Sequence, residues 1–180
     1  MKLVQEKLER HTLSVIVDNE AGILARVAGL FSARGYNIES LTVADISVDL
    51  AISRITIVTC GSAHVVEQII AQLERLVPVH KVTDLTALGP HVERELALVK
   101  VAGTGEHRIE AMRLADVYRA HVLDATTSSF VFELTGSTEK ISTFVDLMRE
   151  VGLVEVARTG VVAIGRGREA AWSHGKEGET

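Results

Sequence analysis

The sequence predicts an α+β fold of two tandem domains, each with the order strand, helix, strand, strand, helix, strand. Short segments rich in β-branched residues alternate with segments whose apolar residues recur at helical spacing. The same order begins near Leu13 and again near Leu96, a period of about 84 residues. The chain has 180 residues, 47% of them hydrophobic, which suits two small cores.

The first repeat begins with a strand over residues 12–18, where apolar residues take alternate positions. A helix follows, and Gly35 lies just past its end, where glycine relieves a left-handed turn. Its apolar face consists of Ile23, Leu24, Val27, Leu30 and Phe31. Residues 37–45 and 52–59 then predict two strands separated by a turn.

A second amphipathic helix starts at Ser62, and a last strand from Val79 to Leu85 completes the first repeat. The second repeat has the same order. Its predicted elements are a strand at 95–101, a helix at 106–119, strands at 122–127 and 129–135, a helix at 138–150 and a strand at 154–160.

This order is typical of a ferredoxin-like sandwich, in which two helices cover one face of a four-stranded antiparallel sheet. We expect a first domain over 11–86, a linker over 87–93 containing Gly89-Pro90, a second domain over 94–167, and a mobile polar tail over 168–180. The other sheet face or an edge remains to be covered, and we expect a partner subunit to cover it.

Composition excludes several classes of function. A net charge of −5 without any basic block argues against nucleic-acid binding. The chain shows neither a signal-peptide pattern nor an apolar run of about 18 residues, so we expect a cytoplasmic protein without membrane association. The single cysteine, Cys60, excludes an internal disulfide, and we expect it to be packed and inert.

No constellation for catalysis or metal binding occurs in the sequence. The seven histidines are scattered and are expected mostly at the surface, and no His, Cys or carboxylate spacing suits a metal ion. We therefore expect no catalytic residues, no metal and no cofactor in this chain.

The start of the first helix is the strongest candidate for a binding site. Unpaired backbone N–H groups at Gly22, Ile23 and Leu24 would hold a carboxylate. Asp18 and Glu20 would suit an ammonium group. The N–H groups and the acidic side chains together favour an α-amino acid, and the apolar surroundings favour an aliphatic side chain. A purely structural reading stays open, with Asn19 capping the helix and Asn37 serving a turn.

Four segments carry a resemblance to a known family: DNEAGILARVAGLFSARGYNIESLTV (18–43), SRITI (53–57), HVERELALVKV (91–101) and EVARTGVVAIGRG (155–167). Together they resemble the regulatory small subunit of acetohydroxyacid synthase, also called acetolactate synthase, in family order over roughly residues 11–167. The resemblance implies an N-terminal ACT domain and a C-terminal ACT-like domain.

The resemblance also implies a homodimer in which a feedback amino acid, usually valine, lies between two ACT domains. Asn19 and the backbone of Gly22, Ile23 and Leu24 would hold it from one subunit. Asn37 and Ile38 would reach it from the other subunit. Between the second and third strands, ADISVDLAIS (44–53) departs from the short turn with proline and acidic residues that is typical of the family.

The catalytic partner that the resemblance implies is a separate large subunit, which uses thiamine diphosphate, magnesium and FAD to condense two 2-oxoacids toward branched-chain amino acids. The small subunit would raise that activity, and valine would withdraw the gain. An alternative is a free-standing ACT sensor that controls another enzyme or a transcription factor. RNA binding is disfavoured because residues 52–59 lack stacking aromatics, and acylphosphatase-like hydrolysis because acidic residues occupy the first loop.

Overall fold

The computed structural model describes residues 7–47 and 49–168, and these residues have the predicted α+β order. They divide into two compact units, one formed by residues 7–92 with 163–168 and the other by residues 93–162. The prediction assigned 163–167 to the second domain, whereas in the structure these residues cluster with the first unit. The predicted tail beyond residue 168 lies outside the described residues.

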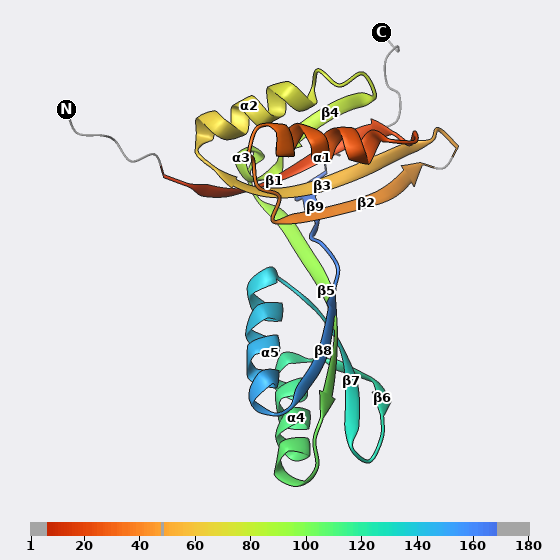
Figure 1. The fold of residues 1–180 in the computed structure, drawn as a ribbon, viewed down its shortest axis with the longest axis vertical. Helices are drawn as coiled ribbons and strands as arrows, with labels where there is room; N and C mark the ends of the chain where they lie inside the picture. Colours follow the sequence, from red (N-terminus) through yellow and green to blue (C-terminus); the bar gives the residue numbers. More distant parts are fainter. Residues whose placement is uncertain (1–6, 48, 169–180) are drawn as a thin grey trace, which may run out of the picture. The chain divides into compact units, whose positions relative to one another are not determined.

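The first unit is a four-stranded antiparallel sheet in the order β2-β3-β1-β4, with two helices on one face (Figure 1). This order places β2 at an edge of the sheet. The elements are β1 (Glu9–Asp18), α1 (Ile23–Ala33), β2 (Ser40–Ser47), β3 (Ile52–Gly61), α2 (Ala63–Leu73) and β4 (Val79–Asp84).

Successive side chains along β1 point to opposite faces of this sheet. Leu13, Val15 and Val17 point to the helices and pack in a buried core with residues such as Phe31 of α1 and Ile69 of α2. The residues between them point the other way, yet Thr12, Ser14 and Ile16 are at most 2% exposed. The expectation that a partner subunit covers this face or an edge of the sheet stays a prediction.

The second unit has the strand order β6-β7-β5-β8. β9 (Val162–Gly165) pairs with β5, and its residues from 163 onward cluster with the first unit. Phe130 and Phe132 of β7 point toward the helices and meet Phe144 of α5 in the core. The elements are β5 (His91–Ala102), α4 (Gly105–Tyr118), β6 (His121–Ala125), β7 (Ser129–Gly136), α5 (Thr138–Glu150) and β8 (Leu153–Arg158).

The predicted linker is not a plain loop. A short helix α3 (Leu85–Leu88) occupies its beginning, and β5 starts at His91. The Asp84 carboxylate caps α3 by accepting hydrogen bonds from the backbone N–H groups of Thr86 and Ala87. The same side chain contacts the His11 ring, with 2.7 Å between Oδ2 and Nδ1. His11 is buried, contrary to the expectation of a surface histidine.

A buried ion pair ties the sheet of the second unit to α5. Glu95 on β5 is 5% exposed, and its Oε2 lies 2.5 Å from Nη2 and 3.2 Å from Nε of Arg158 on β8. Thr138 at the start of α5 donates a hydrogen bond to the other carboxylate oxygen. Three elements thus share one buried carboxylate.

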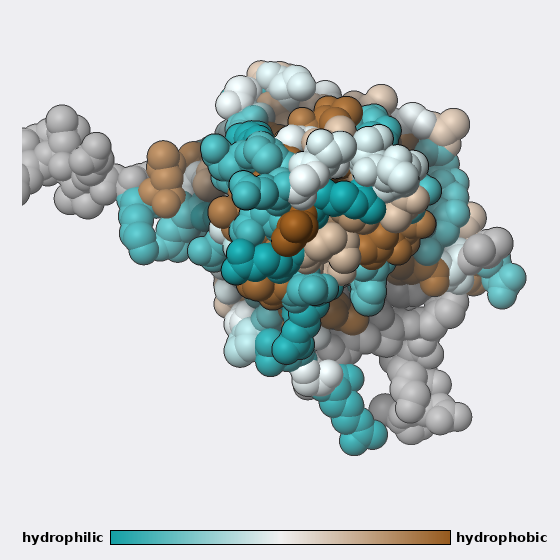
Figure 2. Space-filling view, turned by 90° about the horizontal axis from the view of Figure 1, so that it is seen from below, coloured by the Kyte–Doolittle hydropathy of each residue, from teal (hydrophilic) through white to brown (hydrophobic). Residues whose placement is uncertain are grey.

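Hydrophobic residues also reach the surface among hydrophilic ones in the view of Figure 2. On the second unit, Ile109, Val117 and Leu123 are each more than half exposed. Exposed apolar residues of this kind are normal on folded domains, so they do not by themselves indicate a binding surface.

Cys60 is exposed, so the expectation that it is packed is wrong. It lies near the end of β3, and a hydrogen bond to Glu39 raises the pKa of its thiol, with desolvation as a second cause. A raised pKa lowers the fraction of reactive thiolate at neutral pH.

We expect Cys60 to react with iodoacetamide more slowly than glutathione does between pH 7 and pH 8. The Glu39→Gln variant removes the carboxylate and should react faster at each pH. Mass spectrometry of the alkylated protein over time measures both rates. A wild-type thiol as reactive as glutathione would contradict the raised pKa.

Candidate functional site

The start of α1 leaves backbone donors open, as the sequence predicts. Gly22 is the N-cap residue, with a φ of 88°, and no side chain in the described part of the chain caps the helix. Within residues 7–47 and 49–168, no acceptor contacts the N–H groups of Gly22 or Leu24. A Cβ atom built on Gly22 would meet no atom of the described residues within 4 Å, so they leave the space beside these donors open.

Ile23 differs from the prediction. Its N–H donates to the Glu20 carbonyl at 3.3 Å, a long hydrogen bond. Its side chain is 6% exposed and belongs to the core of the first unit, so it offers no surface to a ligand. Leu24, at 41% exposure, is the apolar side chain that remains accessible at this helix start.

The Asn19 side chain does not cap the helix. Its amide nitrogen donates to Oδ1 of Asp45 on β2 at 3.0 Å, and the Ser53 hydroxyl donates to the same oxygen at 2.6 Å. The Asn19 backbone N–H donates to the Ala51 carbonyl at 2.6 Å. The segment at 44–53 that departs from the family pattern thus holds the loop before α1, a role that the sequence analysis missed.

The two carboxylates of the loop already have partners within the chain. Asp18 contacts Nε2 of His80 at 2.7 Å, and Glu20 lies 3.0 Å from the Arg26 guanidinium. All four side chains are about half exposed. An ammonium group would therefore have to share these carboxylates with His80 and Arg26.

Asn37 and Ile38 lie just before β2, at the other end of the sheet from Asn19. Asn37 is exposed, and its carbonyl accepts a hydrogen bond from Thr59 near the end of β3. Asn19 lies beside Ser53 through their shared partner Asp45. The six residue steps from 53 to 59 span about 20 Å in a strand. A single chain therefore does not bring the two groups of predicted site residues together.

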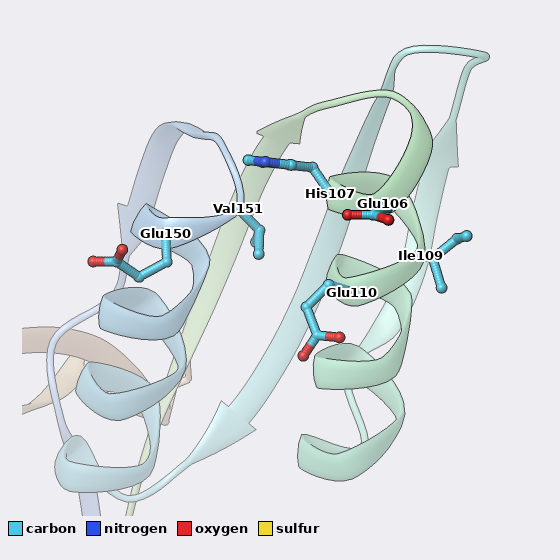
Figure 3. Close-up of a pocket in the computed structure, with 6 residues that line it drawn as sticks. All are labelled: Glu106, His107, Ile109, Glu110, Glu150 and Val151. Atoms are coloured by element: carbon cyan, nitrogen blue, oxygen red, sulfur yellow. The ribbon is translucent and has the colours of Figure 1, made fainter.

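A separate hollow of about 430 Å³ lies in the second unit, between the start of α4 and the end of α5 (Figure 3). The His107 ring points toward Val151, whereas the Glu150 carboxylate points away from α4. Glu106 and Glu110 also line this hollow, and Glu110 pairs with Arg113 at 2.8 Å. Its acidic lining is unsuited to the carboxylate of an amino acid.

Neither a metal centre nor a membrane span is found in the part of the chain that the structure describes. No three His, Cys, Asp or Glu side chains there gather closely enough to hold a metal ion. No helix there is both long and apolar enough to cross a membrane.

Two sequence families match this chain. Residues 13–81 match the family described as AHAS small subunit-like ACT domain. Residues 94–167 match the family described as small subunit of acetolactate synthase. The two matches cover the cores of the two predicted domains.

Similar proteins agree with these families over the length of the chain. The probable acetolactate synthase small subunit of Archaeoglobus fulgidus is 48% identical over 89% of this chain and 99% of its own. The acetolactate synthase isozyme 3 small subunit of Escherichia coli is 48% identical over 88% of this chain and 96% of its own.

A solved structure is similar in fold as well. The crystal structure of the acetolactate synthase small subunit from Thermotoga maritima is 36% identical and aligns with a TM-score of 0.81, covering 89% of this chain and 99% of that one. The order of the elements, the two family matches and these relatives agree. The chain belongs to the acetolactate synthase small subunit family, the regulatory subunits of that enzyme, and carries an ACT domain.

Proposed function

We propose that this chain activates a separate acetolactate synthase catalytic subunit and makes that subunit sensitive to feedback inhibition by valine. The catalytic chemistry, with thiamine diphosphate, magnesium and FAD, would belong to the partner. The observation that carries the proposal is the uncapped start of α1, where two open backbone donors face free space beside an exposed leucine.

The roles of the site residues follow from their chemistry. The amide N–H groups of Gly22 and Leu24 would bind the valine carboxylate, since the positive end of the helix dipole favours an anion there. Asn19 uses its amide nitrogen on Asp45, which leaves its side-chain oxygen to accept a hydrogen bond from the ammonium group. Leu24 would contact the isopropyl group.

Two copies of the chain would complete the site. β2 is an edge strand, and identical edge strands that pair about a two-fold axis run antiparallel. Such pairing lays the start of one β2 beside the end of the other. Asn37 and Ile38 of one copy would then approach the Asn19 loop of the second copy, which one chain alone cannot achieve.

Regulation requires valine to bind one arrangement of the complex more tightly than another. A coupling free energy of about 1–3 kcal/mol gives roughly a five- to hundred-fold response. Binding at a dimer interface can supply this preference because the ligand contacts both copies and thus favours one relative arrangement.

Reconstitution with the catalytic subunit from the same source tests the proposal. We expect the two chains to co-purify, the complex to be more active than the catalytic subunit alone, and valine to reverse that gain. The Gly22→Asp variant should lose valine inhibition because its carboxylate repels that of the ligand.

The matched control is Gly22→Asn, which has the same size and tolerates a positive φ about equally well. It should keep part of the inhibition while folding as well as Gly22→Asp. Unchanged valine inhibition in Gly22→Asp would refute the site. Valine binding without co-purification would instead indicate a free-standing sensor.

A further inference from the structure

Unpartnered buried polar atoms gather on one face of the first unit. Ser14 Oγ, Thr42 Oγ1 and Arg54 Nε are buried and have no hydrogen-bond partner among residues 7–47 and 49–168. They come from three neighbouring strands, β1, β2 and β3. Buried polar atoms without a partner are rare and costly, so three on one face call for a common explanation.

The strand register places these three side chains in two adjacent rows of one sheet face, with Thr56 between Ser14 and Thr42. Ser14 pairs with Thr56, and Thr56 pairs with Thr42, which forms one row across the sheet. Arg54 precedes Thr56 by two residues and so lies on the same face, in the next row. Leu13, Val15 and Ile55 point to the helices, so this row lies on the opposite face.

The two rows carry positive charge and hydroxyl groups but no carboxylate. The Arg54 side chain has no ion pair or hydrogen bond with any described residue. Lys81 on β4 lies in the same row as Arg54, because both pair with Ile16 of β1. Thr83 and Thr56 flank Ser14, and Ala44 pairs with Arg54. An arginine without a carboxylate partner, surrounded by hydroxyl donors, is suited to an oxyanion.

The degree of burial also fits a bound ligand. Ser14 is 2% exposed and lies in the covered middle of its row, between Thr56 and Thr83. Thr42 and Arg54 are only half-buried, and β2 is an edge strand, so the row is accessible from that side.

We propose that the face of this sheet opposite α1 and α2 binds a small oxyanion, a phosphate, sulfate or carboxylate group. The Arg54 guanidinium supplies the charge, and the Ser14 and Thr42 hydroxyls donate hydrogen bonds. The site shares no residue with the proposed valine site and does not depend on it.

Thermal unfolding of the full chain in different salts tests this site. Phosphate, sulfate and acetate are each compared with chloride at constant ionic strength. We expect a saturable rise of about 3 °C in the melting temperature for wild type with at least one oxyanion. The oxyanion that acts distinguishes a phosphate-type ligand from a carboxylate.

The Arg54→Gln variant should lose this rise, whereas the Arg75→Gln variant, at an exposed arginine of the same unit, should keep it. Ser14→Ala should weaken the response without lowering stability in chloride, because it removes an unpartnered hydroxyl. This second variant keeps the test valid if Arg54→Gln does not fold.

Crystals soaked in selenate give a direct readout, with an anomalous peak expected within hydrogen-bond distance of Arg54 and Ser14. Equal anion responses in wild type, Ser14→Ala and any folded Arg54→Gln protein, with no selenate peak at Arg54, would overturn the proposal. Water molecules would then satisfy these atoms.

Discussion

Gly152→Ala is expected to lower the free energy of unfolding of the second unit by about 3 kcal/mol or more. Gly152 lies between α5 and β8 with a φ of 108°, a conformation that L side chains rarely adopt. A Cβ atom there would lie 2.1 Å from the Ala102 carbonyl oxygen at the end of β5. The backbone must therefore move, which would disrupt the 2.9 Å hydrogen bond from Ala102 N–H to the Gly152 carbonyl.

Gly105→Ala is the matched control in the same unit. Gly105 has a φ of 59°, but a Cβ atom there meets no atom of the residues that the structure describes within 4 Å. The free energy of unfolding of this variant should fall by only about 1 kcal/mol, the cost of the left-handed backbone. Urea unfolding followed by circular dichroism measures both variants. If both variants lost the same free energy of unfolding, the contact with Ala102 would not be the cause of the destabilisation by Gly152→Ala.

Glu95→Ala is also expected to lower the free energy of unfolding of the second unit strongly, by about 3 kcal/mol. The change removes the carboxylate that Arg158 contacts through two nitrogens and leaves that guanidinium, 32% exposed, without its charge partner. Thr138 also loses its acceptor at the start of α5. Glu95→Gln should cost less, because its side-chain oxygen can still accept a hydrogen bond.

The exposed pair of Lys100 and Glu155 in the same unit provides the comparison. Its 2.6 Å contact lowers the pKa of Glu155, chiefly through the hydrogen bond from Lys100. Water screens such a pair, so Glu155→Gln should unfold at the same urea concentration as wild type. If Glu95→Ala were equally harmless, the buried pair would have no role in stability.

The sequence was sufficient to predict the repeated order of strands and helices, because apolar spacing determines which face each element buries. The helix predicted at 138–150 has those same bounds in the structure. The short elements α3 and β9 were missed. α3 depends on the cap from Asp84, and β9 on pairing with a distant strand. Neither feature has a periodicity that a window of sequence can display.

The candidate site was predictable only in part. Gly22 next to a helical apolar stripe indicated an open helix start, and the structure has one. The burial of Ile23 and the contact from Asn19 to Asp45 could not be predicted, because both depend on how α1 and β2 pack on the sheet. Whether valine binds there stays a prediction.

The separation of Asn19 and Asn37 along one sheet has a consequence for how an effector would act. A ligand that needs both residues has no complete site on an isolated chain. Binding and association would then be linked by mass action, and each would strengthen the other. Dilution would weaken the apparent affinity for the effector without changing a single contact, so sensitivity to the amino acid would depend on how much of the subunit a cell makes.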